Sequence, residues 1–384
     1  MVDFGWSEDQ EQFRQSLRKF ARNELAPKYG PQDRNREFPV EQLHKMANMG
    51  LFGLRVPVEY GGLGADCVTA GIAVEEIARG DFNCATPIMI AGIGAEIIGQ
   101  FGTEEQKRWW LPSIATGEKT VAVSLTEAEA GSDAASLKMR AIRDGDYYIL
   151  NGEKSSTTMN NADFFFVFAR TDVSQQRARG ISAFLVPRDL QGISTSVYKD
   201  LGCKSIPRGP VVFNDTKVPA QYLIGPENRG FLLVMNSFDY NRVLIALTCL
   251  AVAEQSLEET LQYVKDRKAF GRSLAKFEGI SFPLAEAATL IEAARLLCYE
   301  ALWLRDRKLP HTKEAAMTKW WVPKISVEIV HQCLLFHGHY GYTEEFPFEQ
   351  RLRDALGSQI GDGTAEIQKI VIARELMGRE FLPY

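Results

Sequence analysis

The chain has 384 residues, of which 45% are hydrophobic and 24% charged, and its formal net charge at pH 7 is −5. This composition is ordinary for a globular protein of two or three domains, and it excludes a disordered tail and a fibre. The charges form no long run of one sign, so neither nucleic acid nor a membrane surface is an expected partner. No apolar run approaches ~18 residues and the acidic N-terminus lacks the pattern of a signal peptide, which favours a cytoplasmic protein.

The hydrophobic pattern changes twice along the chain. From about residue 7 to 118 it is helical, because Phe13, Leu17 and Phe20 recur every three or four positions. Short runs typical of β-strands follow, such as TVAVSL, DFFFVFAR and ISAFLVP, separated by DG, NG and Pro turns. Long helical stripes then return and predict a bundle. The expected domains are residues 1–118, 119–232 and 233–384.

The six cysteines are far apart and form no CxxC pair. They are Cys67, Cys84, Cys203, Cys249, Cys298 and Cys333. This spacing argues against a zinc site and against a disulfide framework, so we expect reduced, packed thiols. His337 and His339 lie close together, but no carboxylate or thiolate pattern accompanies them, so structural roles are favoured and no metal is expected.

Residues 357–369 read GSQIGDGTAEIQK and place Asp362 between two glycines ahead of a helical segment. Locally this is a turn, with Thr364 placed to cap the helix that follows. Other motifs occur in order before it: LTEAEAGSD (125–133), LNGEK (150–154), DRKAFGRSL (266–274) and QRLRDA (350–355). Together they resemble the acyl-CoA dehydrogenase family of flavoenzymes over essentially the whole chain.

The resemblance implies a mainly α fold with a central β-domain. Its parts would be an N-terminal helical domain, a β-barrel-like middle domain and a C-terminal four-helix bundle, assembled as a homotetramer with FAD at subunit contacts. The implied reaction is α,β-dehydrogenation of an acyl-CoA thioester: a carboxylate removes the α-proton and a β-hydride moves to flavin N5. An electron-transfer flavoprotein is the implied electron acceptor.

The resemblance also assigns site residues. Those assigned to FAD are Leu125, Thr126, Gly131, Ser132, Ser156, Thr158, Arg267, Phe270, Phe277, Gly338, Thr364 and Glu366. Those assigned to the substrate are Ser132, Asp239, Asn241, Arg242 and Gly363. Without the resemblance, Gly131 and Ser132 also fit a simple turn, and Arg267 fits an exposed helical arginine.

This chain departs from the family pattern at the two positions where family members carry the glutamate that removes the α-proton. Most members carry Glu where this chain has Asp362, and a second subgroup carries Glu immediately before the arginine of FDYNR, where this chain has Asn241. An amide cannot accept an α-proton at neutral pH, so Asp362 is the expected base. Aspartate withdraws the carboxylate by ~1.5 Å, a bond length, and such misplacement can cost ~100-fold in rate. The hypothesis is therefore a substrate crowded at Cα, such as cyclohexane-1-carboxyl-CoA, which would give the ring-1-ene product.

Two further positions depart in the flavin region. Ser156 stands where the family commonly has Trp, and His339 replaces the second glycine of a usual pair that begins at Gly338. The tryptophans of KWWVPK (319–324) fit core packing or a pocket wall. Two alternatives to the dehydrogenase stay open: an enzyme like the nitroalkane oxidases, which also use an aspartate base, and a non-catalytic flavin- or CoA-binding protein.

Overall fold

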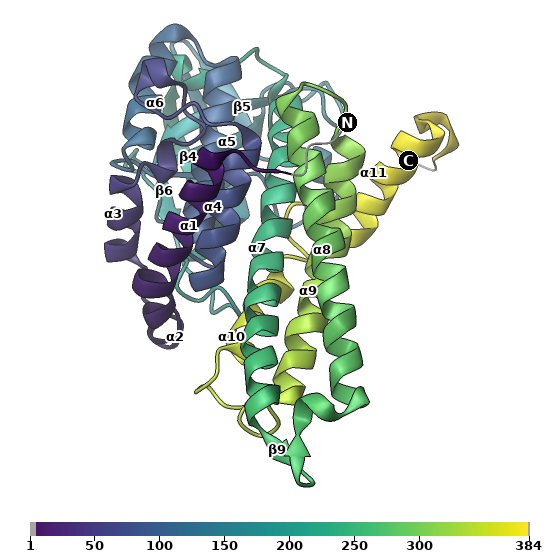
Figure 1. Cartoon of the computed structure of the whole chain (residues 1–384). Coiled ribbons are helices and arrows are strands. Elements are labelled where there is room, and N and C mark those ends of the chain that lie inside the picture. Colours follow the sequence, from purple (N-terminus) through teal and green to yellow (C-terminus); the bar gives the residue numbers. More distant parts are fainter. Residues whose placement is uncertain (1–4, 383–384) are drawn as a thin grey trace.

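The computed structural model describes residues 5–382. Its N-terminal part is helical, and Figure 1 shows these helices beside the sheet. Ser7 begins the first helix, because its hydroxyl accepts the backbone N–H of Gln10 while the Gln10 side chain bonds back. The α-helices of this part are α1 Glu8–Phe20, α2 Ala26–Asn35, α3 Val40–Asn48, α4 Cys67–Gly80, α5 Ala85–Phe101 and α6 Glu104–Ala115, and the π-helical Ala21–Leu25 joins α1 to α2.

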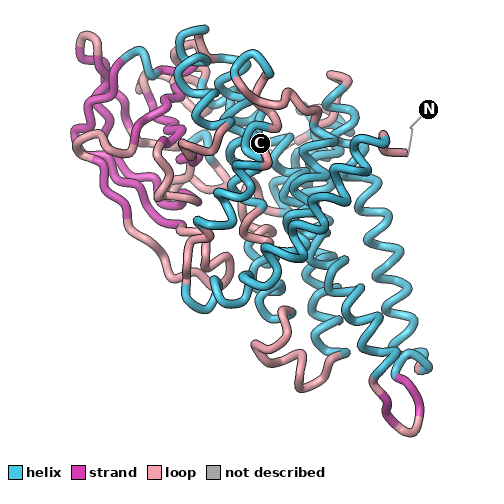
Figure 2. Tube along the Cα trace, turned by 60° about the vertical axis from the view of Figure 1, so that its left-hand side comes forward, coloured by secondary structure: helices cyan, strands magenta, loops and turns pink. Residues whose placement is uncertain are grey.

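The middle part is a β-sheet, drawn in magenta at one side of the molecule in Figure 2. The strand order is β6-β7-β3-β2-β4-β5-β8, with β1 added in parallel to β4. The outer strands β6 and β8 pair with β7 and β5 but, within residues 5–382, not with each other, so this barrel-like sheet is open rather than closed. The strands are β1 Val121–Ser124, β2 Arg140–Asp144, β3 Tyr147–Thr158, β4 Phe164–Arg170, β5 Ile181–Pro187, β6 Ile193–Thr195, β7 Arg208–Pro219 and β8 Leu223–Ile224.

The C-terminal part is a helical bundle built on three long helices. α7 (Gly230–Asp266) descends to a hairpin of β9 (Lys268–Ala269) and β10 (Arg272–Ser273), which Figure 1 places at the lower end of the bundle. The other helices are α8 Glu278–Asp306, α9 Thr312–Phe336, α10 Phe348–Gly357 and α11 Ala365–Met377. Both α10 and α11 pack against α9. The turn that holds Asp362 therefore lies between two helices fixed on the same neighbour.

The three parts share one core, because a single cluster of buried apolar side chains runs through all of them. A polar junction adds to it just before the turn that holds Asp362. The buried carboxylate of Asp354 on α10 accepts hydrogen bonds from the Tyr29 hydroxyl, the Asn83 amide and the backbone N–H of Cys203. Burial raises the pKa of Asp354 to about 7. α10 is thus tied both to the N-terminal helices and to the loop before β7.

The cysteines and His337 have the packed positions that the sequence predicted. All six cysteines are free, and five of them are buried. His337 is buried and stacks on Tyr263 at 4.1 Å between ring centroids, with Nδ1 close to the Cys333 carbonyl. Between residues 5 and 382 no helix combines the length and the apolar character that crossing a membrane requires.

Candidate active site

Asp362 lies in a turn whose backbone conformation is unusual. Its φ is +54° and that of Gly363 is +96°, so two consecutive residues have left-handed or related geometry. Glycine suits the second position, because L side chains rarely adopt a φ of +96° and an added Cβ would also displace Nε2 of Gln368, which would lie 2.4 Å away. Aspartate is among the few residues that tolerate the first. The DG pair therefore meets a steric requirement of the turn as well as supplying a carboxylate.

Side chains from three helices bind the carbonyl groups of this turn. The carbonyl of Asp362 accepts from Nε of Arg242 on α7 at 3.2 Å and from Nε2 of Gln368 on α11 at 3.1 Å. Nζ of Lys319 on α9 donates to the carbonyls of Ser358 at 2.7 Å and Gly363 at 3.2 Å. Burial lowers the pKa of Lys319, and the nearby Asp362 carboxylate acts in the opposite direction. The backbone of Asp362 is thus fixed independently of its side chain.

The carboxylate of Asp362 has its own partner on α7. Nδ2 of Asn241 donates to Oδ2 of Asp362 at 2.5 Å, although 121 residues separate them. The two positions at which the family carries its glutamate therefore meet at one point of this structure. The Asp362 side chain is only half-buried, so a ligand can reach it.

The predicted substrate residues Asp239 and Arg242 are both buried and bind each other. Nη1 of Arg242 donates to Oδ1 of Asp239 at 2.7 Å, and the Thr312 hydroxyl at the start of α9 donates to Oδ2, also at 2.7 Å. Both carboxylate oxygens of Asp239 are thus engaged inside the protein. Asp239 therefore orients the guanidinium of Arg242, and Arg242 in turn donates to the carbonyl of Asp362.

Thr364 occupies the expected N-cap position, directly before α11, but its side chain makes no capping hydrogen bond. Its hydroxyl acts on the Glu366 carboxylate instead. The pKa of Glu366 is lowered, first by its own backbone N–H and then by the Thr364 hydroxyl. These two predicted cofactor residues therefore interact with each other at the start of α11.

A second group of predicted residues belongs to the β-domain, in the loop that begins at Leu125 after β1 and at the end of β3. Lys154 of β3 holds their loop, because its buried Nζ donates to the Leu125 carbonyl at 3.1 Å and to the Glu127 carboxylate at 2.8 Å. Burial lowers the pKa of Lys154 to about 8. The register of β3 against β7 shifts between Lys154 and Thr157, and such bulges re-aim side chains beside active sites. Ser156 lies within the shift, where its hydroxyl accepts from Nη1 of Arg208 at 2.9 Å.

A third group lies far from both, at the hairpin end of the bundle in Figure 1. Phe270, with φ +50°, is at the hairpin tip, 95% exposed and 6.3 Å from the Phe277 ring. Arg267 is exposed at the end of α7, and Gly338 follows α9 with φ +61°. One chain therefore does not bring all the predicted cofactor residues together.

The chain is similar to known proteins along its whole length. Three family models match it: acyl-CoA dehydrogenase N-terminal domain at residues 7–118, middle domain at 122–216 and C-terminal domain at 228–377. The short-chain specific acyl-CoA dehydrogenase of Clostridium acetobutylicum is 38% identical over 98% of this chain and 100% of that protein. The chain belongs to the acyl-CoA dehydrogenase family.

Solved structures of the family agree in fold. Butyryl-CoA dehydrogenase from Megasphaera elsdenii superimposes with a TM-score of 0.95 at 34% identity, over 98% of this chain and 100% of that one. A chain in the structure described as the electron transferring flavoprotein of Acidaminococcus fermentans gives 0.94 at 35%, with the same coverage. The protein is an oxidoreductase, an acyl-CoA dehydrogenase, and its cofactor is FAD.

The described residues fit this cofactor. Gly131 faces open space, since a Cβ there would meet no atom within 4 Å, and Ser132 beside it is exposed. The buried Oε1 of Gln368 has no hydrogen-bond partner within residues 5–382, and a flavin N–H or ribityl hydroxyl would supply one. Across the same residues no group of three or more His, Cys, Asp or Glu side chains could hold a metal ion.

Sequence reasoning missed several residues of this site. Lys154, Lys319 and Gln368 lie inside motifs that the sequence singled out. The two lysines bind backbone carbonyls that are distant in the chain, whereas Gln368 binds carbonyls of the turn directly before its own helix. No sequence motif marked Arg208 as a site residue, because only the fold places it beside Ser156.

Proposed function

We propose that this chain dehydrogenates an acyl-CoA thioester between Cα and Cβ and that Asp362 removes the α-proton. The observation that carries the proposal is the half-buried Asp362 carboxylate, held by Asn241 on a turn whose carbonyls are bound from three helices. A carboxylate in a defined position is what general base catalysis needs. FAD, when bound, supplies the acceptor for the β-hydride. Leu125, Thr126, Ser132, Thr158 and the start of α11 would hold it.

We propose further that the substrate is branched or cyclic at Cα. The Asp362 carboxylate ends ~1.5 Å short of a glutamate, one bond length. Its backbone is bound by Arg242 and Gln368, so the turn does not advance to recover this reach. A substrate that fills the space itself restores contact. Cyclohexane-1-carboxyl-CoA, giving cyclohex-1-ene-1-carboxyl-CoA, is a thioester of this kind.

Straight short-chain thioesters are the second candidate, because the C. acetobutylicum relative is named short-chain specific and the M. elsdenii enzyme acts on butyryl-CoA. The experiment compares anaerobic bleaching of the bound flavin by cyclohexane-1-carboxyl-CoA, isobutyryl-CoA and butyryl-CoA. Faster reduction by the first two supports a crowded Cα, and faster reduction by butyryl-CoA refutes it. Bleaching by nitroethane alone would indicate a nitroalkane oxidase, and flavin that no compound reduces would indicate a binding protein.

We also propose that electrons leave through an electron-transfer flavoprotein, since the similar chain from A. fermentans belongs to a structure described by that name. Reoxidation of the substrate-reduced enzyme by such a flavoprotein, in the absence of oxygen, tests this step. No reoxidation would refute it.

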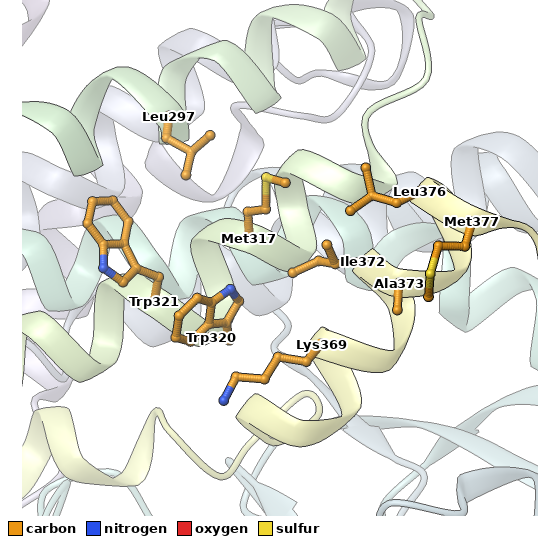
Figure 3. Close-up of a pocket in the computed structure, with 9 residues that line it drawn as sticks. All are labelled: Leu297, Met317, Trp320, Trp321, Lys369, Ile372, Ala373, Leu376 and Met377. Atoms are coloured by element: carbon orange, nitrogen blue, oxygen red, sulfur yellow. The ribbon is translucent and has the colours of Figure 1, made fainter. Parts of the chain in front are cut away.

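A homotetramer is proposed on the evidence of exposed apolar surface. Phe270, Phe282 and Leu296 are exposed along the hairpin and α8. A groove of about 640 Å³ is lined by residues of α8, α9 and α11. Trp320, Trp321, Ile372 and Leu376 are among the lining residues drawn in Figure 3. Apolar areas of this kind mark protein contacts. Sedimentation at micromolar concentration tests the assembly, and a monomer would contradict it.

A further inference from the structure

The side-chain amide of Asn241 has a hydrogen-bond partner for its nitrogen but, among the described residues, none for its oxygen. Nδ2 donates to Asp362, while Oδ1 is buried and has no hydrogen-bond partner in the described part of the chain. The residue is only 7% exposed. Leaving a buried acceptor unpaired costs ~1–3 kcal/mol, so such atoms are rare in folded proteins. The position of this one, beside the carboxylate that takes the α-proton, points to a ligand.

The orientation of the amide follows from chemistry. An ionised carboxylate only accepts hydrogen bonds, so the Asn241 amide must present its N–H group to Asp362. The reverse orientation would place two acceptors against each other. Oδ1 shares its carbon with Nδ2 and is therefore held on the site side of α7 for as long as Asp362 is charged.

The neighbouring donors do not satisfy this oxygen. Nε and Nη1 of Arg242 bind the Asp362 carbonyl and the Asp239 carboxylate. Nζ of Lys319 and Nε2 of Gln368 bind carbonyls of the turn. These bonds occupy Nε and Nη1 of Arg242, Nζ of Lys319 and Nε2 of Gln368, and no group within residues 5–382 donates to Oδ1 of Asn241, which leaves this oxygen available to a donor on a ligand.

We propose that Oδ1 of Asn241 is a specificity site that accepts a hydrogen bond from a hydroxyl or amino group on an atom next to Cα of the acyl chain. The inference rests on the proposed function, because Cα is located by the base. It narrows the substrate class from a branched or cyclic thioester to one that carries a donor at the branch. Asn241 is at the same time a positioning residue for Asp362, because its Nδ2 donates to the Asp362 carboxylate.

Isobutyryl-CoA and 3-hydroxyisobutyryl-CoA test the proposal, since both have one α-hydrogen and a methyl group and they differ by one hydroxyl. The measurement is kcat/KM for anaerobic flavin reduction. A site built for a donor rejects the analogue that lacks it, so the hydroxylated thioester is expected to react at least ~10-fold faster. Asn241→Leu should abolish the preference.

Asn83→Leu is the matched control. Nδ2 of Asn83 also donates to a buried aspartate, Oδ2 of Asp354 at 3.3 Å, and its Oδ1 is likewise unpaired, but it lies at the junction with α10. This variant should keep the wild-type substrate ratio. Equal reaction of both thioesters in the wild type overturns the inference, and so does loss of FAD from Asn241→Leu, which would assign Oδ1 to the cofactor. Failure of every thioester to reduce the flavin refutes the proposed function itself.

Discussion

Asp362→Asn separates the chemistry of the base from the structure of its turn. The substitution exchanges one carboxylate oxygen for NH2, while the bonds from Arg242, Gln368 and Lys319 go to backbone carbonyls and are unaffected. The remaining side-chain oxygen can still accept from Nδ2 of Asn241. The variant should therefore fold, bind FAD and bind thioester as the wild type does.

The expected loss is in proton removal alone. A positioned general base contributes ~10²–10⁴ in rate, so flavin reduction should slow by that factor, or ~3–5 kcal/mol of activation free energy. Stopped-flow absorbance under anaerobic conditions measures the reduction, and the flavin spectrum before mixing verifies cofactor content. A rate within ~10-fold of the wild type, with full FAD, would refute the role of Asp362 as base.

Three further predictions address neighbouring features. Asp362→Gly with Asn241→Glu should reduce flavin at least ~10-fold faster than Asp362→Gly alone, because the two side chains meet at 2.5 Å; no gain in the same assay contradicts this shared position. Burial lowers the pKa of Lys154 to about 8 from 10.5, so between these values the unfolded chain binds a proton that the folded chain lacks, and this residue adds stability as the pH rises. Lys154→Met should flatten the dependence of the free energy of unfolding on pH from 8 to 10.5, and an unchanged slope in urea titrations argues against it. Phe270→Ser should leave the unfolding of the isolated chain within ~0.5 kcal/mol, since the ring is 95% exposed, but should reduce assembly size and FAD content. Unchanged sedimentation and FAD absorbance would count against a contact there.

The sequence predicted the fold well where local rules decide. Hydrophobic spacing predicted the helical, β and helical parts, and the motifs identified the family. The DG turn was predicted from residue type, and the structure adds that both positions have positive φ. Thr364 does occupy the predicted N-cap position, but the prediction that it caps the helix was wrong for its side chain, which makes no capping hydrogen bond.

The remaining site features depend on tertiary contacts. Nothing in the local sequence around Asn241 or Asp362 indicates that they touch, since the contact arises from the packing of α7 against the turn before α11. The same holds for Arg208 with Ser156, and for Lys154 with the carbonyl of Leu125. The sequence left core packing and a pocket wall open for the KWWVPK tryptophans, and in the structure both line the groove between α9 and α11.

The meeting of Asn241 and Asp362 also limits the order in which such a site can change during evolution. A glutamate at 241 placed against an existing aspartate at 362 would put two negative charges together, and one of them would then hold a proton at neutral pH and fail as a base. A neutral residue at one of the two positions avoids this repulsion when the carboxylate moves between α7 and the turn. An asparagine at 241 is such a residue, which leaves this chain one substitution at each position away from the other arrangement.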